Sequence, residues 1–158
     1  MINVNLKVIE NTYENSNAID NTIAYIYRLN KKSPLPIYCY GVDFPPTYNN
    51  IIKSFYKTRD RHPSPPDRHV YHLIISLEFL LPNINFFHIA DDIAKIFDCY
   101  PICYSFHTDT DHPHFHFIIS TVSYLPGYQD LDDSSLLILI GQAQQMALEK
   151  HNMVLNIK

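Results

Sequence analysis

The residues best suited to chemistry gather in one short segment, in which three histidines have the spacing of metal ligands. His114 and His116 are two residues apart in an apolar stretch, so in a β-strand both side chains leave the same face. His107 precedes them, and a turn over residues 108–113 brings it to the neighbouring strand. Imidazoles are the commonest metal ligands, and three on one face leave positions on a divalent ion open, as catalytic sites do. The spacing therefore predicts a metal site formed by His107, His114 and His116.

Two further residues are candidates for orienting these imidazoles from outside the ligand set. Asp109, or alternatively Asp111, lies in the turn and can accept a hydrogen bond from the second nitrogen of an imidazole. His72 lies in another apolar segment, where it either points toward the metal face or caps its strand. The alternative interpretation of the whole segment is a solvated histidine-rich turn or an incidental structural metal site.

The strands that must position these residues follow from alternating apolar and polar side chains. Residues 70–79 place Tyr71 and Leu73 on one face and His72 and Ile74 on the other. The segments around His107 and His116 are close enough in sequence to pair through the turn between them. Similar patterns predict strands over residues 3–10, 102–106, 115–122 and 153–157.

Apolar residues at spacings of three and four predict helices that alternate with these strands. The helices are expected over residues 15–32, 86–97 and 131–147, with a shorter one at 49–57. The proline-rich segments 34–48 and 59–68 are expected to be an irregular connection and a mobile loop. This order predicts one domain over residues 1–158 with an α+β fold: a mostly antiparallel sheet of about five strands, covered on one face by helices.

Composition excludes several classes of protein. The 158 residues are 46% hydrophobic and 18% charged, which suits a soluble domain with its own core. No window approaches the ~18 apolar residues of a membrane span, and the first residues do not resemble a secretory signal. Three cysteines are expected to be reduced thiols, which predicts a cytoplasmic protein without membrane association. The net charge of −4 excludes binding to DNA through a global positive field, so any nucleic-acid site must be local.

One segment has the local positive charge that such a site needs. Five of the chain's 12 basic residues fall within it, interleaved with Phe55 and Tyr56. Cations can follow the backbone of a single strand while aromatic rings stack on its bases. The alternative is a solvated linker that its prolines keep open. The DNA-binding candidates are Lys53, Lys57, Arg59, Arg61 and Arg68.

The histidine segment resembles a motif of a known nuclease family. Residues 107–119 (His-Thr-Asp-Thr-Asp-His-Pro-His-Phe-His-Phe-Ile-Ile) resemble the histidine-triad motif of the MobA/MobL-type relaxases, endonucleases with two histidines separated by a hydrophobic residue. Residues 23–26, followed by two lysines, resemble the nucleophile motif of that family, and residues 71–76 resemble its central strand. The resemblance extends from about Ala18 to Ile157 and implies the palm-like relaxase fold.

The resemblance implies a tyrosine nucleophile, and helical phase separates the two nearest candidates. At about 100° per residue, Tyr27 falls about 40° from Ile23 on the buried face, whereas Tyr25 falls about 160° away. Tyr25 is therefore the expected catalytic residue. By resemblance, its attack nicks single-stranded DNA at an origin of transfer, leaves a 5′-phosphotyrosyl intermediate, and initiates plasmid or integrative-element mobilisation.

The resemblance also implies a cofactor and partners. Family members use Mg²⁺ or Mn²⁺, and three imidazoles suit Mn²⁺ or Zn²⁺ better than Mg²⁺. The expected partners are single-stranded DNA and accessory DNA-binding and coupling proteins. Two alternatives remain open: a non-catalytic single-strand DNA-binding module of the same fold, and a rolling-circle replication initiator or transposase of the same nuclease class.

Overall fold

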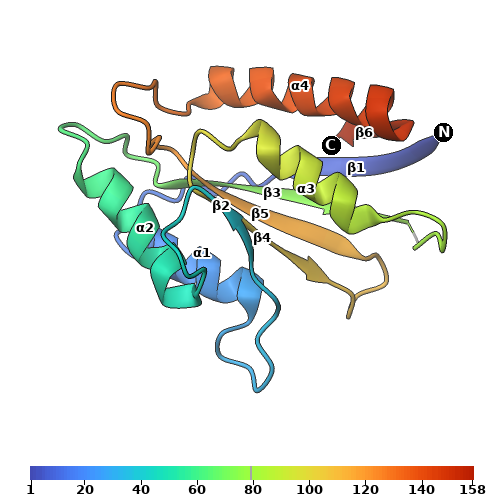
Figure 1. Ribbon diagram of the computed structural model, residues 1–158, viewed down its shortest axis with the longest axis horizontal. Helices are drawn as coiled ribbons and strands as arrows, with labels where there is room; N and C mark the ends of the chain where they lie inside the picture. Colours follow the sequence, from blue (N-terminus) through green and yellow to red (C-terminus); the bar gives the residue numbers. More distant parts are fainter. Residues whose placement is uncertain (79) are drawn as a thin grey trace.

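The computed structural model describes residues 1–78 and 80–158, which form one six-stranded sheet and four helices (Figure 1). The strand order is β2-β4-β5-β3-β1-β6, and every neighbouring pair is antiparallel except β1 and β6. The predicted α+β class with a mostly antiparallel sheet is therefore confirmed. The elements are β1 (Ile2–Val8), α1 (Ala18–Tyr27), β2 (Tyr38–Tyr40), α2 (Tyr48–Asp60), β3 (Val70–Ser76), α3 (Phe86–Ile96), β4 (Ile102–His107), β5 (His114–Ser120), α4 (Asp133–His151) and β6 (Met153–Ile157).

Two strands differ most from the sequence prediction. Strand β2 lies within the segment expected to be irregular, and its three residues pair with β4 at the edge of the sheet. A strand this short has no readable alternation, so only its partner reveals it. The strand expected over residues 70–79 is β3, which ends at Ser76. Phe79, the last residue of that expected strand, lies outside the described residues.

The helices cover both faces of the sheet, so the expectation of one covered face is wrong. Helices α3 and α4 pack on one face of the sheet and enclose the larger core. The side chains of β3 and β5 on that face, such as Leu73 and Phe117, are buried in it. Helices α1 and α2 pack on the other face against Val70, Cys103 and Ile118. Because these three residues are apolar and face away from the larger core, the second face needs cover as well. In Figure 1, α4 lies at the top of the view and α1 and α2 at the lower left.

The cover on the second face is incomplete, and this positions the candidate site. Ile74 and Ser76, on the same face as Val70, are only half-buried. Helix α1 ends at Tyr27, where Arg28 adopts the left-handed conformation (φ 56°, ψ 46°) that stops the helix. The polar side chains of β4 and β5 therefore lie where the helix cover ends.

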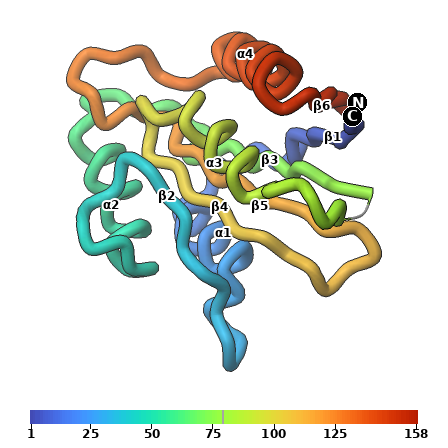
Figure 2. Tube along the Cα trace, turned by 45° about the vertical axis from the view of Figure 1, so that its right-hand side comes forward, coloured from blue at the N-terminus to red at the C-terminus, as the bar shows by residue number. Residues whose placement is uncertain are grey.

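The first and last strands close the sheet at its other edge. Ile2 is paired with Met153 and Leu6 with Ile157 in parallel register, so β1 and β6 lie side by side, as Figure 2 shows. None of the helices in the described ranges combines the length and apolar character that a membrane crossing requires.

Candidate active site

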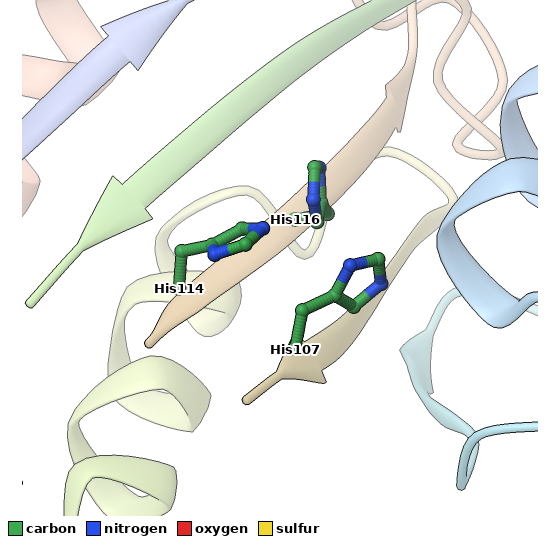
Figure 3. A group of neighbouring side chains, drawn as sticks. All are labelled: His107, His114 and His116. Carbon is green, nitrogen blue, oxygen red and sulfur yellow. The ribbon is translucent and has the colours of Figure 1, made fainter. Parts of the chain in front are cut away.

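The pairing of β4 with β5 brings the three histidines together on one face of the sheet. His107 is paired with His114, and Ser105 with His116. The ring centroids lie 5.2 Å apart for His107 and His114, 4.3 Å for His107 and His116, and 4.7 Å for His114 and His116. Each ring offers a nitrogen within 4.8 Å of the other two, and Figure 3 shows the rings converging. The spacing required for a shared metal ion is thus present.

Backbone carbonyls fix the tautomers of two of these imidazoles. His107 places Nε2 2.7 Å from the carbonyl oxygen of Ile26, and His114 places Nδ1 2.9 Å from that of His112. A carbonyl oxygen only accepts, so each of these nitrogens carries the proton. The unprotonated nitrogens are then His107 Nδ1 and His114 Nε2, which is the arrangement that metal-binding histidines need.

His116 is held by a second histidine from β3. Its Nδ1 lies 2.7 Å from His72 Nε2, and His72 Nδ1 lies 3.0 Å from the hydroxyl oxygen of Tyr13. His116 Nε2 is buried and, among the described residues, has no hydrogen-bond partner. A buried nitrogen without a partner is costly unless a ligand satisfies it. His116 Nε2 is therefore the atom that most clearly calls for a bound cation.

Burial favours the neutral form of His72, His107 and His116 by lowering their pKa values. Desolvation, reinforced by the neighbouring His107, lowers the pKa of His72 to about 4 and that of His116 further still. Desolvation also lowers the pKa of His107, while its hydrogen bond to Ile26 opposes that shift. Neutral imidazoles expose lone pairs at neutral pH, so the donor set fits a divalent metal ion.

Tyr25 lies directly against this group. Its ring centroid is 5.6 Å from that of His116, 6.4 Å from that of His72 and 6.5 Å from that of His107. The side chain is 62% exposed, whereas Tyr27 is fully buried and donates its hydroxyl proton to the Tyr104 carbonyl at 2.8 Å. The helical-phase prediction that Tyr25 is open and Tyr27 is in the core is confirmed.

Asp109 does not contact an imidazole, contrary to the role expected for it. Its carboxylate pairs with the Arg28 guanidinium at 2.6 Å, and this pair holds the pKa of Asp109 below its ordinary value. Arg28 in turn lies 3.3 Å from His107 Nδ1. Arg28 therefore links Asp109 to His107. The left-handed conformation of Arg28 at the end of α1 places its side chain between these two residues.

The side chain of Arg59 hydrogen-bonds to the protein backbone, so it is less available to DNA than an exposed arginine would be. It lies in α2, which extends to Asp60 and is longer than the helix expected over residues 49–57. Its guanidinium donates to the carbonyl oxygen of Pro66 at 2.5 Å and to that of Arg68 at 3.5 Å. These bonds hold the segment that follows the helix.

The other four basic candidates have mixed surroundings. Lys53 and Arg61 are exposed, and Lys57 is exposed while paired with Asp43 at 2.9 Å. Arg68 lies with its guanidinium carbon 4.5 Å from the centre of the Tyr71 ring. All four stay candidates for binding DNA.

Two residues at this site were missed by sequence reasoning: Tyr13 and Arg28. Both adopt positive φ angles, 49° and 56°, which bend the chain toward the histidines. Tyr13 lies in a connection without periodicity and offers no signal. Arg28 lies just beyond the end of α1 in the left-handed conformation, so helical periodicity does not predict its contacts either.

Comparison with known proteins agrees with this geometry. The family model described as "Relaxase: MobA/VirD2-like, nuclease domain" matches residues 25–137, a segment that begins at Tyr25 and contains all three histidines. No curated protein and no solved structure gives a significant match. Relaxase nuclease domains nick DNA, bind single strands and depend on metal ions. Because the match covers more than half of the chain, this protein belongs to the relaxase family.

Proposed function

We propose that this relaxase domain nicks single-stranded DNA at an origin of transfer, with Tyr25 as the nucleophile and a divalent ion bound by His107, His114 and His116. The observation that carries the proposal is the exposed phenol of Tyr25 beside His107 and His116, two of the three histidines whose nitrogens converge. The proposed domain spans residues 1–158.

The proposed reaction exchanges one ester for another. The Tyr25 hydroxyl oxygen forms a bond to the scissile phosphorus, and the bond from phosphorus to the 3′ oxygen breaks. The phenolic proton leaves the tyrosine, and the departing 3′ oxygen ends as a hydroxyl. The 5′ phosphate is then linked to Tyr25, and one phosphodiester bond has replaced another, so rejoining needs no external energy source.

The protein's residues position the nucleophile and orient the imidazoles that would bind the metal ion. Helix α1 presents Tyr25 on its open face, while Ile26 from the same turn fixes the His107 tautomer. His72 fixes the orientation of His116. A divalent ion, when bound, would neutralise charge on the non-bridging phosphate oxygens. We infer Mn²⁺ or Zn²⁺ as the better-suited ion, with Mg²⁺ as the harder alternative.

The proposed biological setting follows from this chemistry and the family. The substrate would be plasmid or integrative-element DNA, which places the reaction in the cytoplasm and makes accessory DNA-binding and coupling proteins the expected partners. The exposed cations at the α2 end, Lys53, Lys57 and Arg61, with Arg68, are the proposed contacts to the more distant part of the strand.

Covalent capture tests the proposal. The protein is incubated with Mn²⁺ and a pool of 3′-labelled single-stranded oligonucleotides, and protein-linked label is resolved on a denaturing gel. We expect an adduct whose nucleotide maps to Tyr25 by mass spectrometry, and no adduct with Tyr25→Phe. Tyr128→Phe is the matched control, because Tyr128 is exposed and lies outside the site.

The outcomes separate the competing functions. An adduct on another tyrosine refutes the assignment of Tyr25. DNA binding without any adduct in Mn²⁺, Mg²⁺ or Zn²⁺ indicates a single-strand binding module instead. An adduct that forms only on a replication origin or transposon end indicates a replication initiator or transposase.

A further inference from the structure

We propose that Arg28, assisted by Lys31, forms a subsite that binds a phosphodiester of the DNA strand beside Tyr25. This inference rests on the proposed function, because it assumes that a single strand passes over Tyr25. In this proposal Arg28 binds the substrate and does not only stabilise the fold.

The first argument is the location of Arg28. A hollow of about 580 Å³ opens beside the candidate nucleophile, and its lining includes Asn21, Tyr25, Arg28, Lys31 and His107. Arg28 and Lys31 make this hollow cationic. A strand whose scissile phosphate lies at Tyr25 must place adjoining backbone close by, and that backbone carries one negative charge per nucleotide.

The second argument is the resting geometry of Arg28. Its two terminal nitrogens each lie 2.6 Å from an oxygen of Asp109, so the guanidinium presents its paired donors to a carboxylate. Phosphate accepts the same planar, two-pronged donor. The Asp109 side chain is 52% exposed, so solvent and substrate can reach the pair.

The third argument comes from His107. The Nε2 proton is given to Ile26, so the lone pair of His107 is on Nδ1, and Arg28 Nη2 lies 3.3 Å from that atom. One lone pair cannot serve both a guanidinium and a metal cation. Arg28 must therefore leave Nδ1 when a cation binds. The N–H that pointed at Nδ1 is then available to a phosphate, which can also compete with the exposed Asp109 carboxylate for the guanidinium.

The competing interpretation is that Arg28 only clamps the β4–β5 turn to α1. The two interpretations differ in how Arg28→Ala affects metal and DNA. A lost clamp loosens the site and weakens both ligands. A lost phosphate contact weakens DNA alone, while removal of the competing cation strengthens metal binding.

The first measurement is a calorimetric titration of the DNA-free protein with Mn²⁺. Arg28→Ala should lower the Mn²⁺ dissociation constant roughly 3- to 10-fold, because a positive charge beside His107 is removed. Arg28→Lys keeps a charge without the paired donors and should bind Mn²⁺ nearly as the unmodified protein does. Lys95→Ala, which removes one positive charge on α3 at the opposite face, is the matched control and should change nothing.

The second measurement is a double-mutant cycle on DNA binding. All proteins carry Tyr25→Phe, and the probe is an oligonucleotide selected from a random pool, with single phosphates replaced one at a time by neutral methylphosphonates. Arg28→Ala should weaken binding roughly 10- to 100-fold, as expected for a lost charge-assisted bond. At one phosphate position, the methylphosphonate should lower the DNA affinity of the protein that retains Arg28. The same methylphosphonate should not lower the DNA affinity of Arg28→Ala any further.

Three results would overturn the proposal: additive effects at every phosphate, a parallel loss of Mn²⁺ and DNA affinity, or unchanged DNA affinity. Neither measurement depends on cleavage. If the Tyr25 adduct never forms, the proposed function fails while the Arg28 subsite can still be demonstrated.

Discussion

At the scale of single residues, the two nitrogens of His116 have opposite surroundings. Nδ1 is held by His72, and Nε2 is buried without a partner in the described part of the chain. His116 can offer Nε2 to a cation only if its proton sits on Nδ1, facing His72. The orientation of this proposed ligand therefore depends on His72, a residue outside the proposed ligand set.

Removing His72 should weaken metal binding without removing a ligand. His72→Leu keeps a similar volume but leaves His116 Nδ1 without a partner, so Mn²⁺ affinity should fall roughly 10- to 100-fold. Calorimetry measures the affinity, and thermal unfolding monitors the fold. Tyr13→Phe removes only the hydroxyl beside His72 Nδ1 and should have a smaller effect. An Mn²⁺ affinity unchanged in His72→Leu would refute this role.

Some of the site could be read from the sequence and some could not. The shared face of His114 and His116 and the exposure of Tyr25 follow from the periods of a strand and a helix. The contacts of Tyr13 and Arg28 depend on backbone turns with positive φ, which no periodicity encodes. Arg28 also captures Asp109, so the expected contact between Asp109 and an imidazole is absent.

At the scale of elements, the length of α2 changes what its basic residues do. The helix continues to Asp60, so Arg59 points back onto the segment that follows and donates to the Pro66 carbonyl. Arg61, just beyond the helix, is exposed. Sequence reasoning grouped the two arginines because charge density does not distinguish a cation that binds the backbone from one that faces solvent.

These two arginines should therefore respond differently to substitution. Arg59→Ala should lower the free energy of unfolding by about 1–3 kcal/mol, because the half-buried carbonyl of Pro66 loses its charged donor. Arg61→Ala should leave stability unchanged but reduce the slope of log affinity against log salt by about 0.7 if Arg61 contacts a phosphate. Urea unfolding and DNA titrations at several salt concentrations measure the two effects. An unchanged slope would place the DNA elsewhere.

The second face of the sheet changes character along its strands, which explains why the sequence pattern does not predict its helix cover. Val70, Cys103 and Ile118 share a face with His72, His107 and His116, so that face is apolar at one end and polar at the other. Alternation along each strand identifies the two faces but not how far a helix will extend over them. Helices α1 and α2 pack on the apolar end of this face, and they leave the polar end with the histidines uncovered.

At the scale of the whole molecule, α3 and α4 are joined through one buried carboxylate. Asp92 on α3 is 7% exposed and lies 2.7 Å from both Lys150 Nζ and His151 Nε2 on α4. Burial alone would raise the pKa of Asp92, but the hydrogen bonds from these two partners outweigh it and lower the pKa. The ionised carboxylate is thus the form that stabilises the fold.

This interaction predicts a pH dependence of stability. Because the folded pKa of Asp92 is depressed, its contribution is present above the ordinary value of 3.8 and is lost as the pH falls below it. Asp92→Asn should be less stable at neutral pH and lose less stability on acidification. Urea unfolding across this range tests it, with Asp43→Asn, an exposed partner of Lys57, as the control. Parallel pH profiles for the unmodified protein and Asp92→Asn would contradict the assignment.

The half-covered second face has a topological consequence for the proposed substrate. Tyr25 and the histidines lie at the margin of that face, on the surface of the sheet rather than at the end of a tunnel. A site of this kind receives an internal stretch of strand laid on from the side, so no end has to be threaded through the protein. A covalently closed circle, which has no ends to thread, can therefore present its target as readily as a linear fragment.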